Sequence, residues 1–145
     1  MKFGKEYFDF CKNENGFDMN GIGEWQNQYY KMLVDIFEEH IGKKHKMLDM
    51  GCATGTLLET FRRNGLDNMW GADVSDWYIE QSPYNDIKHR MVNSESGKLP
   101  FSNDMFYFIH MAQVIEHIPE EAIPGILNEL YRVLMPGGIL YISTV

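Results

Sequence analysis

The sequence predicts an α/β fold, a single domain with helices on both faces of a mainly parallel sheet. The first observation behind it is an apolar run at residues 47–50 that passes through a glycine-containing turn into the helical segment TLLETFRR. A second observation is the alternation of apolar strands with helical segments over the rest of the 145 residues. Such alternation is typical of a parallel sheet covered by crossover helices.

The turn after residues 47–50 is the first candidate ligand site. Asp49 lies near the carboxyl end of this strand, and Gly51 and Gly55 bracket the turn. In open α/β sheets ligands bind at the carboxyl ends of strands, and glycine lets backbone N–H groups come close to a polar ligand. We therefore expect a ligand here.

The spacing of the glycines bears on the kind of ligand. The dinucleotide fingerprint G-x-G-x-x-G requires glycine at positions 51, 53 and 56, and this chain has Ala53 and Thr56. Both replacements add bulk where a pyrophosphate would approach the backbone. An NAD-dependent oxidoreductase is thus disfavoured and is kept as an alternative.

Two later strands carry polar residues at or near their ends. Residues 68–75 predict a strand ending at Asp73, 18 positions beyond Gly55, where a carboxylate can accept both ribose hydroxyls of a nucleoside. The alternative for Asp73 is a helix N-cap. Phe106–Met111 predicts the next buried strand, within which His110 is expected to be a core histidine.

Helical periodicity appears on both sides of these strands. Leu127, Leu130 and Leu134 give one apolar face to a helix that we expect Pro136, Gly137 and Gly138 to end, before a last strand at residues 139–145. Near the N-terminus, residues 23–42 predict a helix capped by Gly42. Its core face is expected to contain Trp25, Tyr29, Leu33, Ile36 and Phe37.

The glycine turn resembles a known family. Asp49, Gly51, Ala53 and Gly55 follow the E/D-x-G-x-G-x-G pattern of class I S-adenosylmethionine-dependent methyltransferases, with alanine in place of one glycine. The resemblance runs from residue 47 to residue 145. It includes the strand ending in Asp73, the segments MVNSES and GKLPF, and the IEH turn at residues 115–117. Departures are Asn93 and Tyr107, where the family most often has an acid.

This resemblance implies a Rossmann-like methyltransferase fold, three-layer α/β/α with strand order 3-2-1-4-5. Because the family usually builds seven strands, we expect the last two to be missing and the chain to be a fragment of a larger enzyme, with dimerisation through the exposed fifth strand as the second expectation. Residues 1–44 are expected to form an N-terminal extension of the same domain, and residues 45–145 the cofactor-binding core. The extension contains an aromatic loop that we expect to act as a lid, with Tyr7, Phe8, Phe10 and Phe17.

The resemblance also implies the roles of individual residues toward S-adenosylmethionine, whose product is S-adenosylhomocysteine. The loop and the turn after the fourth strand would hold the methionine portion, Asp73 the ribose, and Asn93 with Ser94 the adenine. His117 is the candidate base for an oxygen or nitrogen acceptor, and its alternative is a turn residue bonded to backbone. The implied cofactor residues are Asp49, Gly51, Cys52, Ala53, Gly55, Asp73, Val74, Asn93, Ser94, Ala112 and Gln113.

The amino-acid composition bears on which molecules the protein binds and where it is located. The formal net charge of −8 disfavours a nucleic acid and favours a small-molecule acceptor. Neither a membrane-spanning run nor a signal peptide is evident, and Cys11 and Cys52 show neither disulfide nor metal-ligand spacing, so the cytoplasm is the expected location. No metal is expected.

Two further functions stay open. One is a catalytically silent domain that binds S-adenosylmethionine. The other is a metal-assisted RNA 2′-O-methyltransferase, since residues 113–117 resemble its E-x-x-E-H motif with Gln113 in place of the first acid, a weaker ligand for a hard cation.

Overall fold

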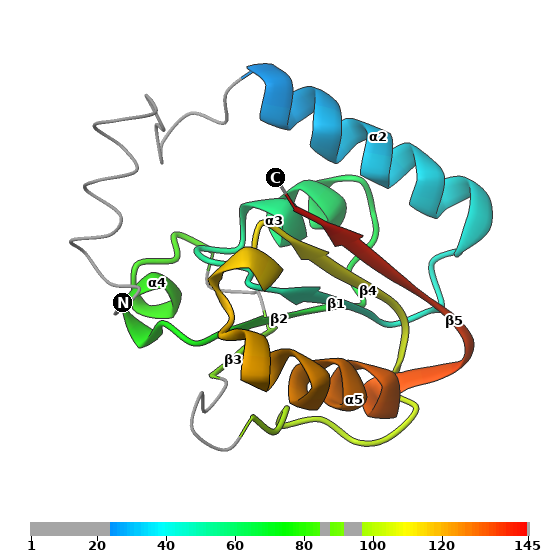
Figure 1. Ribbon diagram of the computed structural model, residues 1–145. Coiled ribbons are helices and arrows are strands. Elements are labelled where there is room, and N and C mark those ends of the chain that lie inside the picture. Colours follow the sequence, from blue (N-terminus) through cyan, green and yellow to red (C-terminus); the bar gives the residue numbers. More distant parts are fainter. Residues whose placement is uncertain (1–23, 85–87, 92–96, 145) are drawn as a thin grey trace.

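The computed structural model describes residues 24–84, 88–91 and 97–144 (Figure 1). The aromatic loop expected to act as a lid lies outside these ranges, and so do Asn93 and Ser94. The predictions made for them stay predictions.

Five parallel strands form one sheet in the order β3-β2-β1-β4-β5, which confirms the predicted order. The arrowheads in Figure 1 point to one edge of this sheet, so the carboxyl ends of the strands meet there. The strands are β1 (Met47–Met50), β2 (Met69–Asp73), β3 (Lys88–Met91), β4 (Phe106–Ala112) and β5 (Leu134–Ser143).

Helices cover both faces, which confirms the three layers. In Figure 1, α2 and α3 lie over one face and α5 over the other. Two apolar clusters fill these layers, one containing Phe61 of α3 and the other Leu130 of α5. The helical elements are α2 (Glu24–His40), α3 (Thr56–Arg63), α4 (Asp76–Glu80), η1 (Ile115–His117), η2 (Glu120–Ala122) and α5 (Ile123–Val133).

Helix α2 packs into the same cluster as α3. The ring of Phe37 contacts Phe61 and Phe108 edge-on, with centroids 4.9 and 4.0 Å apart. Leu33 and Phe37 are buried as predicted, but Ile36 is 42% exposed and Val34 is buried in its place. The predicted apolar face was therefore wrong at Ile36, because the apolar cluster between α2 and the sheet takes Val34 instead.

The junction between α5 and β5 differs from the prediction. The helix ends at Val133, before Pro136, and Leu134 already pairs with Phe106 as the first residue of β5. The carbonyls of Arg132 and Val133 accept the N–H groups of Asp104 and Met105 at 3.0 and 2.8 Å. These bonds to the segment before β4 replace the next helical turn.

Pro136, Gly137 and Gly138 lie instead in an irregularity of the strand pair. The register shifts between Phe106 and Phe108, so residues 135–138 lie opposite Tyr107 alone. These residues form a bulge that lets the chain change from helix to strand without a separate loop.

β5 is the last strand of the described sheet, and Ile139 and Ile142 on it are 44% and 37% exposed. Pairing of this strand with a second copy stays a prediction. Among the helices of the described part of the chain, none is both long and apolar enough to cross a bilayer.

Candidate functional site

The glycine turn after β1 folds back on the end of β2. The N–H groups of Gly51 and Cys52 both donate to the carbonyl of Ala72, at 2.7 and 3.2 Å. Gly51 has a φ of 82°, and a Cβ built there would overlap the side chain of Val114. Only glycine fits this position, so the turn can pack closely between β2 and the segment after β4.

Asp73, at the end of β2, holds the same turn from the side. Its Oδ2 accepts the N–H of Ala53 at 2.9 Å, and its Oδ1 accepts the N–H of Ser75 at 2.8 Å. An ionised carboxylate has about four acceptor positions, so Asp73 keeps acceptor capacity for a hydroxyl group of a ligand. The cap of α4 is Ser75, whose Oγ accepts the N–H of Tyr78, and the N-cap alternative for Asp73 is therefore wrong.

Asp49 is buried at the end of β1 and contacts the neighbouring strand. Its Oδ1 lies 2.7 Å from Nδ1 of His110, and Nε2 of His110 lies 2.9 Å from the phenol oxygen of Tyr29. His110 is buried, as expected of a core histidine, but it also joins β1 to α2 through hydrogen bonds.

The segment after β4 also lies at the carboxyl edge of the sheet. Ala112 ends the strand, and Gln113 has a φ of 55° while its N–H donates to the carbonyl of Ser143 at 2.8 Å. His117 then lies exposed at the end of η1, and its backbone N–H donates to the carbonyl of Val114 at 3.0 Å. The candidate base is thus at the carboxyl edge of the sheet.

The predicted cofactor residues that the structure describes all lie at this edge. Val74, 41% exposed, adds an apolar surface directly beside the buried Asp73. The loops and strand ends after β1, β2 and β4 carry Asp49, Gly51, Cys52, Ala53, Gly55, Asp73, Val74, Ala112 and Gln113.

The electrostatic environment of the loop is negative. Burial raises the pKa of Asp73, the N–H groups of Ser75 and Ala53 lower it, and the nearby carboxylate of Asp49 raises it again. Burial, Asp49 and Asp73 together raise the pKa of the Cys52 thiol well above its ordinary value. Cys52 therefore stays protonated, and the loop favours a ligand that carries positive charge.

These groups fit S-adenosylmethionine. It has two cationic centres, the sulfonium and the ammonium, which suit the buried carboxylates of Asp49 and Asp73. Its ribose diol suits the remaining acceptor capacity of Asp73. Helix α3 begins after Gly55 with no side-chain cap, and the N–H groups of its first turn can receive a carboxylate.

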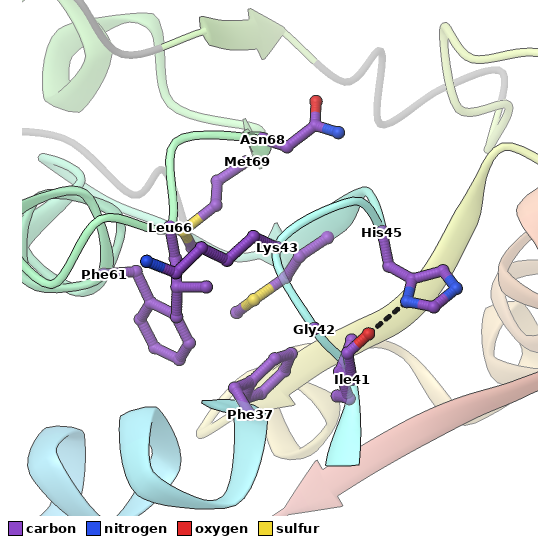
Figure 2. A pocket seen from close by; sticks show the side chains of 10 residues that line it. Phe37, Ile41, Gly42, Lys43, His45, Phe61, Leu66, Asn68 and Met69 are labelled. Atoms are coloured by element: carbon purple, nitrogen blue, oxygen red, sulfur yellow. Dashed lines mark hydrogen bonds between the residues drawn. The ribbon is translucent and has the colours of Figure 1, made fainter. Parts of the chain in front are cut away.

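A small hollow lies far from this edge. Figure 2 shows that it lies between the end of α2 and the starts of β1 and β2, and Phe37, Met47 and Met69 are among its lining residues. Within residues 24–84, 88–91 and 97–144, no group of three His, Cys, Asp or Glu side chains is placed to hold a metal ion. The polar groups at the carboxyl edge thus remain the candidate site.

Comparisons with known proteins agree with this geometry. Residues 22–145 match a family described as a methyltransferase domain. A demethylmenaquinone methyltransferase of Symbiobacterium thermophilum is 28% identical over 94% of this chain and 57% of its own length. A ubiquinone biosynthesis O-methyltransferase of Acinetobacter baylyi is 24% identical over 82% of this chain and 52% of its own. The chain thus spans about half the length of these curated relatives.

Among solved structures, the PH0226 protein of Pyrococcus horikoshii OT3 superposes with a TM-score of 0.74 at 20% identity. The match covers 97% of this chain and 66% of that one. At this identity the likeness shows the fold alone.

The contacts of His110 with Asp49 and Tyr29 were not predicted from the sequence. A signal was present, since Asp49 and His110 are polar residues inside two apolar strands predicted to be neighbours. Their register, in which Asp49 lies beside His110, became visible only with the sheet.

Proposed function

The chain belongs to the methyltransferase domain family, and from this premise we propose that it transfers a methyl group from S-adenosylmethionine to a small-molecule acceptor. The observation that carries the proposal is the position of Asp73, whose carboxylate is fixed by Ala53 and Ser75 and keeps acceptor capacity for a ribose. A carboxylate so placed beside a glycine turn is suited to a nucleoside carrying positive charge.

When bound, S-adenosylmethionine supplies an electrophilic methyl group on its sulfonium. The protein's task is then alignment, since holding two reactants in line contributes up to about 7 to 11 kcal/mol. The loop backbone is held by Ala72 and Asp73, and the segment after β4 is held by Ser143 through Gln113. Both sides of the site are thereby fixed before the ligand arrives.

His117 is proposed as the group that takes a proton from an oxygen or nitrogen acceptor. It is exposed at the carboxyl edge, so an acceptor can reach its ring. Histidine suits this work because its charge changes near neutral pH.

A small-molecule acceptor in the cytoplasm is proposed for two reasons. The curated relatives are named for menaquinone and ubiquinone chemistry. The net charge of −8 opposes binding to a polyanion, and neither cysteine lies in a disulfide or metal motif.

Calorimetry with S-adenosylmethionine and S-adenosylhomocysteine tests the proposal. We expect micromolar binding of both, and Asp73→Ala should weaken it at least tenfold, because it removes a charged hydrogen-bond acceptor. Glu80→Gln, an exposed acid at the end of α4, is the matched control and should bind like wild type. Binding unchanged by Asp73→Ala would refute the assigned site.

A catalytically silent domain that binds S-adenosylmethionine is the second candidate. It predicts cofactor binding without methyl transfer to a panel of quinol, phenol and amine acceptors. Transfer of radiolabelled methyl to any of these acceptors would exclude it. A fluorescence titration with NADH addresses the oxidoreductase alternative, for which binding tighter than that of S-adenosylhomocysteine is required.

A further inference from the structure

Three polar side chains from three elements form a continuous chain of hydrogen bonds beside the cofactor loop. Oδ1 of Asp49 in β1 bonds to Nδ1 of His110 in β4 at 2.7 Å, and both side chains are only 6% exposed. Nε2 of His110 bonds to the phenol of Tyr29 in α2 at 2.9 Å. Both ring nitrogens of His110 are therefore used.

Aromatic rings fix the imidazole in place. The ring of Tyr141 in β5 lies parallel to it, with an angle of 4° and centroids 5.6 Å apart, and the ring of Tyr29 lies tilted at 6.1 Å. Rotation of the imidazole would break both hydrogen bonds and these contacts. The imidazole of His110 therefore has a fixed orientation beside the Asp49 carboxylate.

Only one oxygen of Asp49 is engaged in this way. Among the described residues, none donates a hydrogen bond to its Oδ2. Gly51 and the ligand turn follow only two positions later in the chain. A largely buried carboxylate oxygen is stabilised when a charged donor reaches it, and an ammonium group is such a donor.

Neighbouring groups increase the preference for a cation. Burial and the Asp49 charge raise the pKa of Tyr30, as they do that of Cys52, and Asp49 opposes ionisation of Asp73. The negative charge of Asp49 therefore acts on groups of α2, of the glycine turn and of the end of β2. A positively charged ligand would relieve it.

We propose that His110, held by Tyr29, is a positioning residue that orients the Asp49 carboxylate so that Oδ2 receives the ammonium group of the cofactor's methionine portion. The inference rests on the proposed function. It assigns a role in cofactor recognition to a side chain in the middle of a core strand and to one on α2, neither of which belongs to the glycine turn.

Two ligands separate positioning from a purely structural role. S-Adenosylhomocysteine carries the amino-acid portion, whereas 5′-methylthioadenosine has the same nucleoside and thioether without it. Loss of a merely structural residue would weaken both ligands alike. Loss of a positioning residue for the ammonium would weaken S-adenosylhomocysteine selectively.

Four variants make the test, each measured by calorimetry with both ligands and checked for folding by circular dichroism. His110→Phe keeps a ring beside Tyr141 and removes both hydrogen bonds. His110→Asn keeps an N–H near the Nδ1 position. Tyr29→Phe removes only the phenol hydroxyl, and Tyr131→Phe, at an 80% exposed position, is the control.

We expect His110→Phe to weaken S-adenosylhomocysteine about tenfold and to leave 5′-methylthioadenosine unchanged, because one charge-assisted contact is lost. His110→Asn should recover most of the affinity, and Tyr29→Phe should lower the ratio of the two affinities a few-fold. Equal loss of both ligands, or no loss of either, would overturn the inference.

If His110→Phe does not fold, Tyr29→Phe decides, since its side chain is only partly buried. An unchanged affinity ratio in that variant would also overturn the inference. Failure of the wild-type protein to bind S-adenosylhomocysteine would instead contradict the proposed function, so the two failures are distinguishable.

Discussion

Asp73 and Ala53 lie 20 residues apart in the chain, and the Asp73 carboxylate accepts the Ala53 N–H at 2.9 Å. The end of β2 thereby fixes the loop after β1. Ala53 makes this contact with a φ of 45°, a left-handed conformation that costs roughly 1–2 kcal/mol per residue for a side chain with a Cβ. The loop therefore retains a strained alanine where the family pattern has glycine.

Replacing Ala53 by glycine should relieve this strain. We expect Ala53→Gly to raise the free energy of unfolding by up to about 1 kcal/mol, after the greater freedom of glycine in the unfolded chain is subtracted. Affinity for S-adenosylhomocysteine should not fall, because the N–H to Asp73 is kept. Urea unfolding and calorimetry measure the two quantities.

The matched control is Ala72→Gly, in the middle of the sheet rather than in the turn. It should destabilise the protein by at least about 0.5–1 kcal/mol, since glycine is more flexible in the unfolded chain and the buried methyl group of Ala72 is lost as well. A loss of stability in Ala53→Gly as large as in Ala72→Gly would show that the positive φ is not strained.

Acid should weaken the attachment of α5 to the segment before β4. Arg132 donates to the carbonyls of Leu99 and Phe101 at 3.0 and 2.8 Å, and its Nε and Nη2 also donate to the carboxylate of Glu129. Hydrogen bonds from Arg132 lower the pKa of Glu129 from 4.5 to about 2. The contribution of this pair is complete above the unfolded pKa and is lost as the pH falls from near 4.5 toward 2.

The measurement is urea unfolding at a series of pH values for wild type and Glu129→Gln. The stability difference between the two should be largest above pH ~5 and should shrink as the pH falls toward 2. Glu121→Gln, at an exposed position of η2, should run parallel to wild type. A difference between wild type and Glu129→Gln that stays constant with pH would contradict the pairing of Glu129 with Arg132.

His117 should affect the chemical step and not cofactor binding. With an acceptor that must lose a proton, His117→Ala should lower kcat about 100-fold, the usual contribution of a general base. Its exposed side chain lies at the end of η1 and not in the glycine turn, so the Kd for S-adenosylhomocysteine should stay unchanged. The control is Glu116→Gln, the neighbouring exposed residue. Unaltered turnover in His117→Ala would favour the alternative that His117 is a turn residue bonded to backbone and not a base.

Much of this architecture was predictable because local signals and tertiary packing agree. The apolar runs at β1, β2 and β4 and the glycine turn predict the same elements that the sheet requires. The predictions failed where a partner distant in sequence decided the outcome. Helix α5 ends at Val133 because Asp104 and Met105 take its last carbonyls, and periodicity contains no trace of those bonds.

In the candidate site, too, some features were predictable from the sequence and others depend on tertiary contacts. Asp73 was predictable from its spacing to the turn, whereas its bond to Ala53 depends on how the loop returns to β2. His110 lies in an apolar run that predicts core, and its role depends on its neighbours across the sheet and on α2. Side-chain pairing between strands requires the register, which the sequence alone does not specify.

Two adjacent glycines in the bulge of β5 allow the cost of backbone strain to be measured separately from the cost of steric crowding. Gly137 has a φ of 80°, and a Cβ there would meet nothing within 4 Å. A Cβ on Gly138 would lie 2.8 Å from the carbonyl oxygen of Tyr107 and 2.9 Å from that of Met135. We expect Gly137→Ala to cost about 1 kcal/mol through φ alone. Gly138→Ala should cost more, because backbone atoms of the strand pair must shift.

Urea unfolding of the two variants checks this order. Hydrogen exchange at the amides of β4 provides a second readout, because a shift of Tyr107 should increase exchange in Gly138→Ala and not in Gly137→Ala. Gly125→Ala in α5, where a Cβ also meets nothing within 4 Å, is the control and should stabilise the protein slightly, since alanine favours a helix over glycine. Equal destabilisation by Gly137→Ala and Gly138→Ala would mean that β5 can move away from β4 at the bulge without cost.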